Sequence, residues 1–400
     1  MKLPSLASLL FCASLVQTIT SFYMSPSIGV HHQSRYKTEL SSWPRRDVLG
    51  GFLLGGAVFG GAPKGARATS KTEPPVADLP MIRLKLPQAG LGREYVAIKL
   101  KIDGKGPFDF MVDSGLTTEL ITPHLQQSLG IAAGNEKLAG LAAGGGTVAN
   151  SLIDLDSASL CCGKIQGGEE FKLPKLHAVI TDFPQEHIDP AHNVEGMLGM
   201  ELLSLFDVDF DFKNNRLRFW KPGTADTTGL VEIPAVVINE SGLIGIRLSV
   251  PGAKQPILAF LDCGSTFSCM NWKAAAQLGL PPKTDPSYSN GLAVSAVGID
   301  GRLLELPIIK QELTFTGDIE KDSSGQPIGF YPPPKGWKNW DPINLAIGDL
   351  PAFRSVLGDG VIPYEGPAAL VGLDILGQRR VIFEAGRDKT RRRRIFMAPK

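Results

Sequence analysis

The chain alternates between short apolar runs and clusters of glycine, proline and polar residues, a pattern typical of short β-strands joined by turns. Residues 98–102 (Ile-Lys-Leu-Lys-Ile) alternate apolar and charged positions, which predicts a half-buried strand. The apolar run of residues 110–112 then leads straight into Asp113-Ser114-Gly115. A buried Asp is costly if it stays charged and unpaired. A turn Asp that caps its own backbone is common in this context, so the stretch alone leaves both interpretations open.

A repeat of this stretch in the second half of the chain favours a functional interpretation of Asp113 over a simple turn. Residues 256–266 (Pro-Ile-Leu-Ala-Phe-Leu-Asp-Cys-Gly-Ser-Thr) align without a gap with residues 107–117, which places Asp262 opposite Asp113 at an offset of 149. Downstream, residues 197–203 around Gly199 match residues 370–376 around Gly372. Each copy then ends in a further apolar strand. Two copies of one unit, each with an apolar-Asp-x-Gly turn, are not explained by two accidental turns.

The paired motifs resemble those of the aspartic peptidases of the pepsin and retropepsin group. In that family, hydrophobic-hydrophobic-Asp-Ser/Thr-Gly is followed much later by hydrophobic-hydrophobic-Gly. The resemblance covers about residues 80–386 and implies a mostly β, bilobed acid-protease fold, with two homologous β-rich lobes facing each other across a central cleft. It also implies that Asp113 and Asp262 form the catalytic dyad, with Gly199 and Gly372 as lobe-core glycines behind them.

The chemistry of peptide hydrolysis fits such a pair. Two carboxyls about 3 Å apart cannot both ionise, so they share one proton and supply a base for water and an acid for the carbonyl oxygen. The flanking residues are expected to support the two loops: Ser114, Gly115, Thr117, Cys263, Gly264, Ser265 and Thr266. Ser114 fits the family's cross-linking hydroxyl, whereas Cys263 departs from it, because a thiol is a weak donor.

The third position of each loop predicts an asymmetry. Ser265 is expected to hydrogen-bond Asp262 and keep it ionised, whereas Leu116 leaves Asp113 to hold the shared proton. For Cys263, packing as a small buried side chain is favoured over a redox role.

Other segments predict cover for the cleft. Gly144, Gly145 and Gly146 suit the tip of a mobile flap hairpin, and residues 297–302 are its equivalent in the second lobe. Residues 331–340 combine three prolines with two tryptophans; a packed surface loop is favoured over a role in covering the cleft or binding a partner. Asp207, Asp209 and Asp211 alternate with apolar residues and predict the polar face of a strand.

The distribution of charge indicates which partners the protein can bind, and the N-terminal residues indicate where in the cell it is sent. The net charge of +1 divides into a basic N-terminal region, a basic C-terminal end and a body with 27 basic and 37 acidic residues, which argues against nucleic acid as a partner. Residues 1–68 resemble signal, transit and twin-arginine segments in series, with Arg45-Arg46 and an Ala-x-Ala site ending at Ala68. This presequence predicts a plastid, thylakoid-lumen address; a secreted or endomembrane address is the alternative.

The predicted organisation is therefore a presequence (1–68), an N-terminal extension (69–79), a first lobe (80–221), a linker (222–229), a second lobe (230–386) and a basic tail (387–400). The expected activity is that of an aspartic endopeptidase, a hydrolase that acts as a monomer on a polypeptide in the cleft. It needs no cofactor or metal, and the mature chain has no membrane span. A catalytically silent two-lobed peptide-binding protein is the alternative, and Cys263 and Leu116 are its best support.

Overall fold

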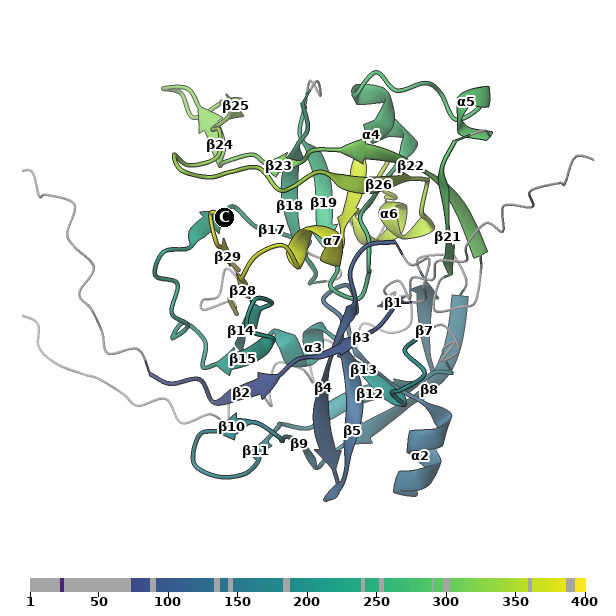
Figure 1. The fold of residues 1–400 in the computed structure, drawn as a ribbon, viewed down its shortest axis with the longest axis vertical. Helices are drawn as coiled ribbons and strands as arrows, with labels where there is room; N and C mark the ends of the chain where they lie inside the picture. Colours follow the sequence, from purple (N-terminus) through teal and green to yellow (C-terminus); the bar gives the residue numbers. More distant parts are fainter. Residues whose placement is uncertain are drawn as a thin grey trace, which may run out of the picture. The chain divides into compact units, whose positions relative to one another are not determined.

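Strands dominate the structure, and the mostly β fold class is confirmed (Figure 1). The computed structural model describes residues 22–24, 73–86, 91–132, 137–142, 147–182, 188–238, 242–251, 255–289, 291–297, 303–358, 362–385 and 393–400. The presequence motifs, the flap glycines Gly144–Gly146 and residues 298–302 lie outside these ranges. None of the helices in the described ranges is long and apolar enough to cross a membrane.

The first lobe is built on a sheet with the strand order β1-β7-β8-β12-β6-β13-β5-β4-β9-β11, and β3 pairs with β4. Helices α2 and α3 follow β6 and β13 along the chain. The bounds of these elements are β1 (Phe22–Met24), β3 (Ile82–Leu84), β4 (Tyr95–Ile102), β5 (Lys105–Val112), β6 (Glu119–Ile121), α2 (Pro123–Leu129), β7 (Lys137–Ala142), β8 (Thr147–Leu155), β9 (Ala158–Leu160), β11 (Phe171–Lys172), β12 (Leu176–Ile180), β13 (Val194–Leu198) and α3 (Met200–Leu203).

The second lobe has the order β17-β18-β19-β27-β20-β26-β22-β21, and β23 pairs with β18. A separate hairpin, β24-β25, and four helices complete this lobe. The bounds are β17 (Val236–Val237), β18 (Ile244–Ser249), β19 (Ile257–Leu261), β20 (Cys269–Met270), α4 (Trp272–Gln277), α5 (Pro286–Ser289), β21 (Ala293–Val297), β22 (Leu303–Gln311), β23 (Thr314–Phe315), β24 (Ile319–Lys321), β25 (Pro327–Phe330), β26 (Ile343–Ile347), α6 (Pro351–Val356), β27 (Ala368–Val371) and α7 (Leu373–Leu376).

The two sheets repeat each other strand for strand. From β4 to β7 in the first and from β18 to β21 in the second, neighbours occur in the same order and the same relative direction. In particular, β13 runs parallel to β5 with Leu198 opposite Val112, and β27 runs parallel to β19 with Val371 opposite Leu261. The sequence repeat is therefore a repeat of topology.

Local sequence accounts for the elements around each loop. β4 and β5 are joined by Asp103-Gly104, both with positive φ (51° and 71°), as a tight hairpin turn requires. Thr122 caps α2 by accepting a hydrogen bond from the backbone N–H of Leu125, and Asn271 caps α4 in the same way. A capped helix therefore begins shortly after each Asp-x-Gly loop.

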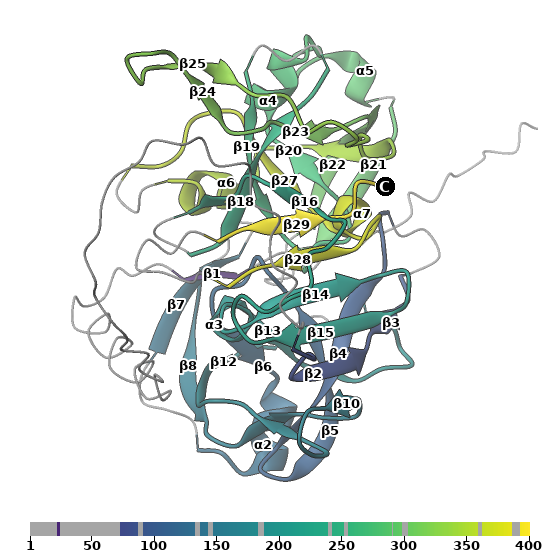
Figure 2. The same ribbon diagram turned by 90° about the vertical axis from the view of Figure 1, so that its left-hand side faces the viewer.

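Strands from both halves form a third sheet with the order β10-β2-β15-β14-β28-β29-β16 (Figure 2). Its central pairing joins the halves, because β14 is antiparallel to β28 with Val208 opposite Phe383. The bounds of its strands are β2 (Ala77–Pro80), β10 (Lys164–Ile165), β14 (Asp207–Asp211), β15 (Arg216–Trp220), β16 (Val231–Ile233), β28 (Val381–Phe383) and β29 (Ile395–Met397).

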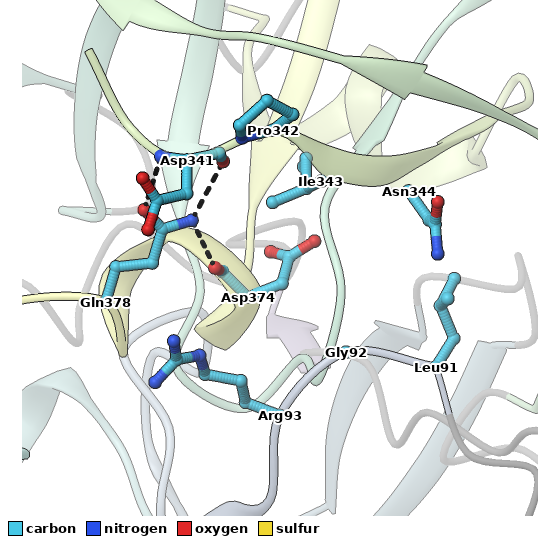
Figure 3. Close-up of a pocket in the computed structure, with 9 residues that line it drawn as sticks. All are labelled: Leu91, Gly92, Arg93, Asp341, Pro342, Ile343, Asn344, Asp374 and Gln378. Carbon is cyan, nitrogen blue, oxygen red and sulfur yellow. Dashed lines mark hydrogen bonds between the residues drawn. The ribbon is translucent and has the colours of Figure 1, made fainter.

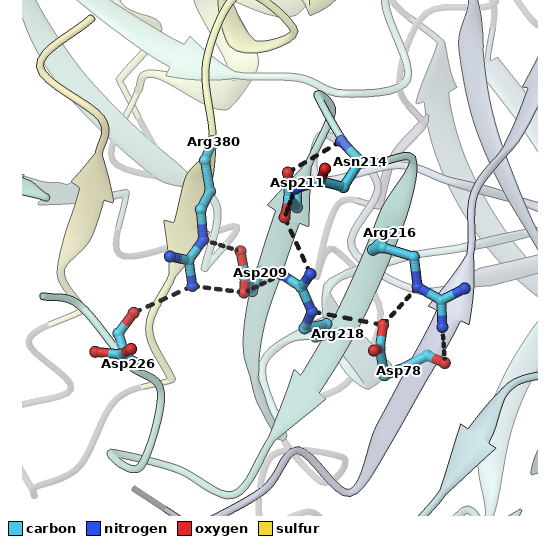
Figure 4. A network of polar contacts seen from close by, with 8 residues as sticks. All are labelled: Asp78, Asp209, Asp211, Asn214, Arg216, Arg218, Asp226 and Arg380. Carbon is cyan, nitrogen blue, oxygen red and sulfur yellow. Dashed lines mark hydrogen bonds and ion pairs between the residues drawn. The ribbon is translucent and has the colours of Figure 1, made fainter. Parts of the chain in front are cut away.

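The aspartates of β14 form the polar face of a strand, as predicted, and this face is itself buried. Asp209 is fully buried and accepts two hydrogen bonds from Arg380 (both 2.8 Å) and one from Arg218 (3.1 Å) (Figure 4). Asp211 binds the other nitrogen of Arg218 (3.0 Å). A buried carboxylate is tolerated only when it is paired and hydrogen-bonded, and here the pairing connects residues from both halves of the chain.

The end of the chain also differs from the prediction of a basic tail at residues 387–400. Residues 395–397 form β29, between β28 and β16, and Ile395 is fully buried. Arg394 pairs with Glu384 instead of being solvated freely. The strand was missed because its apolar Ile-Phe-Met run is short and follows four consecutive arginines.

The Pro/Trp segment packs into the second lobe. Trp340 is 1% exposed, and Trp337 contacts the ring of Phe315 at 4.8 Å between centroids. The guanidinium of Arg379 lies over the ring of Trp337, with its carbon 4.6 Å from the ring centroid. The favoured interpretation as a packed loop thus agrees with its contacts.

Candidate active site

The loops that carry Asp113 and Asp262 are positioned identically. The N–H of Asp113 donates to the carbonyl of Leu198 at the end of β13 (2.9 Å), and that of Asp262 donates to Val371 at the end of β27 (3.0 Å). Each Oδ1 accepts the N–H of the glycine two residues later, at 2.8 Å from Gly115 and 2.9 Å from Gly264. Both carboxyls are buried, with 1% and 0% of the residue exposed.

The structure brings the two carboxyls together. Burial raises the pKa of Asp113 well above its ordinary value, and the neighbouring charge of Asp262 raises it further. A hydrogen bond between the two side chains acts in the same direction, whereas the bond from Gly115 opposes it. Two carboxyl groups in contact disfavour ionisation of both at once, so this arrangement favours a pair that shares a single proton.

Gly264 permits this approach. A Cβ at this position would overlap the carboxyl group of Asp113. The glycine after the second Asp is therefore required by the close contact between the loops, in addition to any demand of the turn.

Ser114 and Cys263 cross-link the loops reciprocally. The Ser114 hydroxyl donates to the carbonyl of Leu261 and accepts from the N–H of Cys263 (both 3.0 Å). The Cys263 thiol donates to the carbonyl of Val112 (3.2 Å) and accepts from the N–H of Ser114 (3.1 Å). The thiol thus takes the place of a hydroxyl. Burial and the charge of Asp113 raise its pKa far above the ordinary value, which keeps it neutral.

The lobe-core glycines contact the loops from behind. A Cβ on Gly199 would lie 2.7 Å from the carbonyl oxygen of Thr118 and 2.9 Å from that of Leu116. A Cβ on Gly372 would overlap the backbone at Phe267. The residue after each glycine donates its N–H to the loop, with Met200 bonded to Leu116 (2.7 Å) and Leu373 bonded to Ser265 (2.8 Å).

Ser265 does not support Asp262 as predicted from the sequence. Its hydroxyl donates to the carbonyl of Phe267 (2.8 Å). A hydroxyl has one proton, so none is left for the Asp262 carboxylate. The sequence identified the residue type correctly but did not show which of two nearby acceptors the side chain reaches.

The two threonines differ in their contacts. Thr266 is fully buried and its carbonyl accepts the N–H of Arg93 (2.9 Å). The Thr117 hydroxyl oxygen is buried and has no hydrogen-bond partner among the described residues.

Arg93 was missed in the sequence, because it lies in an irregular segment outside both motifs. It comes from the first lobe, yet its guanidinium donates to the carbonyl of Gly377 in the second (2.6 Å). It lines a pocket of about 270 Å³ behind the second loop, together with Asp341, Asp374 and Gln378 (Figure 3). Neither Asp113 nor Asp262 lines this pocket, so it is separate from the pair of carboxyls.

The flap glycines lie outside the described residues, so the flap stays a prediction, but the strands on either side of it are described. β7 and β8 form the hairpin that flanks residues 144–146, and β21 and β22 form its counterpart in the second lobe. Phe22–Met24, inside the predicted presequence, pairs antiparallel with β7. Among the described residues, no group of three or more His, Cys, Asp or Glu side chains could hold a metal ion.

Comparisons with known proteins give one family match and similar solved structures. Residues 98–202 match the sequence model of the aspartyl protease family, a segment that runs from β4 through Asp113 to α3. The resemblance to aspartic peptidases is thereby confirmed. No curated protein matches the sequence. Among solved structures, the crystal structure of basic 7S globulin from soybean is similar, with a TM-score of 0.44 and 10% identity over 80% of this chain and 94% of that chain.

Proposed function

We propose that the protein is an active aspartic endopeptidase that hydrolyses extended polypeptides with the Asp113/Asp262 dyad. The family match supports a peptidase-like protein of the aspartic type. The observation that carries the catalytic assignment is the contact of the two buried carboxyl loops, which lie so close that a Cβ on Gly264 would overlap the Asp113 carboxyl. Burial and the charge of Asp262 raise the pKa of Asp113. A pair that holds one proton can act as acid and base in the same step.

In the proposed mechanism, Asp113 carries the shared proton and Asp262 the negative charge. Asp262 removes a proton from a water molecule, the water oxygen bonds to the peptide carbonyl carbon, and Asp113 gives its proton to the carbonyl oxygen. The tetrahedral gem-diol intermediate then breaks its C–N bond: Asp262 gives its proton to the amide nitrogen, and one hydroxyl of the intermediate gives its proton to Asp113. The products are one carboxylic acid and one amine, and the dyad returns to its starting state with one proton on Asp113.

The test is cleavage of a peptide library at acid pH by the chain beginning near Thr69, with and without pepstatin. Asp113→Asn and Asp262→Asn should each lower kcat by about 10²–10⁴-fold or more while the urea unfolding transition remains. Asp211→Asn, at a buried aspartate outside the dyad, serves as the matched control and should keep its turnover. Retained turnover in either dyad variant would overturn the shared-proton mechanism.

A catalytically silent peptide-binding protein is the second candidate. Cys263 was its main support in the sequence, but the thiol keeps both contacts of the cross-link. Peptide binding without cleavage by the wild-type protein, under conditions in which an active peptidase of this family cleaves the same library, would favour this candidate.

The address is a separate proposal. We infer that residues 1–68 are removed and that the mature protein lies in the thylakoid lumen, supported by Arg45-Arg46 and Ala66-Arg67-Ala68. N-terminal sequencing of the purified protein should begin near Thr69. Retention of residues 40–60, or recovery of the protein from the medium, would contradict this address.

A further inference from the structure

A second buried carboxyl lies directly behind the first catalytic loop. Glu119 is the first residue of β6 and is fully buried. Its Oε1 accepts a hydrogen bond from the N–H of Leu202 in α3 (3.0 Å). Its Oε2 is buried and receives no donor from the described residues. Such an oxygen would be costly as part of a carboxylate, but it is satisfied if it carries a proton and donates it.

The acceptor for that proton is Glu201 of α3. Its Oε1 binds the Nδ1 of His177 (2.7 Å), and its Oε2 accepts the hydroxyl of Thr118 (3.0 Å). A side-chain hydrogen bond also connects Glu119 with Glu201. Two carboxyl groups can form such a bond only when one of them is protonated, and Glu119 is the one without an external donor at its second oxygen.

We propose that Glu119 is a positioning residue that carries a proton and donates it to Glu201, closing a bridge that holds the first catalytic loop in place. The bridge itself follows from the contacts of these two residues. Its effect on catalysis rests on the proposed peptidase function.

The link from this bridge to the dyad is short. Glu119 holds the N–H of Leu202, two residues after Met200, in the single turn of α3. Met200 in turn donates its N–H to the carbonyl of Leu116 in the catalytic loop (2.7 Å). If both glutamates were ionised, their repulsion would separate β6 from α3 and disturb the loop that presents Asp113.

The second lobe has an equivalent contact in which the donor is a hydroxyl, which does not lose its proton in the physiological pH range. Ser268 occupies the position equivalent to Glu119 in the repeat, and Asp374 that of Glu201. The Ser268 hydroxyl donates to Asp374 (2.6 Å), and its N–H does so as well (3.0 Å). A hydroxyl donates at any pH, whereas a carboxyl donates only while it is protonated. In the first lobe the donor, Glu119, can lose its proton as the pH rises, whereas the Ser268 donor of the second lobe cannot.

Charged groups around the pair fix the sign of the pH dependence. Burial, then the charge of Glu201, raise the pKa of Glu119 well above its ordinary value. His177 of β12 faces Glu201, with Asp154 and Lys175 beyond it, and the Glu201 hydrogen bond raises the His177 pKa. From β13, Glu195 faces Thr122 and His124 instead. The bridge is complete below the ordinary pKa of a glutamate and is lost as the pH rises through the raised pKa of Glu119.

The test compares Glu119→Gln with the wild type. A glutamine accepts from Leu202 with its oxygen and donates to Glu201 with its nitrogen at every pH. The urea midpoint of the wild type should fall as the pH rises from about 4 to 8 by more than that of the variant, since glutamate has an ordinary pKa of about 4.3. Glu119→Met, which has a similar length and no donor, should have a lowered midpoint throughout this range.

Two further measurements separate the bridge from a merely structural role. The infrared carbonyl band of a buried protonated carboxyl should be present in the wild type and lose intensity in Glu119→Gln. The alkaline limb of kcat/KM should be less steep in Glu119→Gln, because only the dyad then has to keep a proton. Equal pH dependence of the urea midpoint in both proteins overturns the bridge, whether or not the protein proves to be a peptidase. An altered midpoint profile with an unchanged kcat/KM profile overturns the positioning role.

Discussion

The thiol of Cys263 is expected to act as a hydroxyl substitute, and a pair of variants tests this directly. Thr and Val have nearly the same shape and differ by a hydroxyl in place of a methyl group. Cys263→Thr should restore a donor to the carbonyl of Val112 and an acceptor for the N–H of Ser114. Cys263→Val removes both while keeping the volume, so any strain from the extra methyl group is common to the two variants.

The magnitude follows from the groups left unpaired. A buried donor or acceptor that loses its partner costs about 1–3 kcal/mol. The two groups that Cys263→Val leaves unpaired are the carbonyl of Val112 and the N–H of Ser114, and both residues are fully buried. The free energy of unfolding of Cys263→Val should therefore lie about 2–4 kcal/mol below that of Cys263→Thr, allowing for partial relaxation.

Urea unfolding and kcat/KM of the two variants are the assays. We expect Cys263→Thr to match or exceed the wild type in stability, because a hydroxyl is the stronger donor. Cys263→Val should also lose kcat/KM, since the loops that carry the dyad are no longer cross-linked. Equal stability and activity of the two variants would show that Cys263 only fills space, and the reciprocal cross-link would then be refuted.

Three further outcomes are expected. Ser265→Ala should leave the acid limb of kcat/KM unmoved and cost about 1 kcal/mol in stability, because its hydroxyl bonds Phe267; a shifted limb would contradict this. Gly264→Ala should abolish peptide cleavage, because the new methyl group overlaps the Asp113 carboxyl; undiminished kcat/KM would rule out the close contact. Burial raises the pKa of Asp374 to about 6, so stability should fall by about 3 kcal/mol as the pH rises from about 4 to above 6. Asp374→Asn should flatten that part of the urea-midpoint profile, and an unchanged slope would refute it.

The sequence predicted the parts of the site that depend on chain order and residue type. The gapless repeat located Asp113 and Asp262, and the distant glycine motifs located Gly199 and Gly372. These features follow from periodicity and from steric demands that only glycine meets. The structure places all four at the two loops, and the catalytic role of the aspartates remains the proposal stated above.

Contacts chosen between competing partners could not be predicted in the same way. The Ser265 hydroxyl reaches a carbonyl instead of a carboxylate, and Asp209 is buried because an arginine from the other half of the chain reaches it. Glu119 was not singled out from the sequence. Its isolation becomes visible only when α3 packs over it, since long-range packing decides which polar groups lose contact with water.

The position of β29 in the shared sheet has a consequence for the order of events during synthesis. Residues 395–397 lie between β28 and β16, so neither neighbour has its final partner until this part of the chain has left the ribosome. Each lobe sheet is encoded earlier and can form while translation continues, whereas the joining sheet is completed only afterwards. The β14–β28 pairing that joins the halves does not involve β29, so the two carboxyls can meet before this strand is in place. Residues 395–397 then act as a closing strand: they give β28 its second neighbour and attach β16 to the joining sheet.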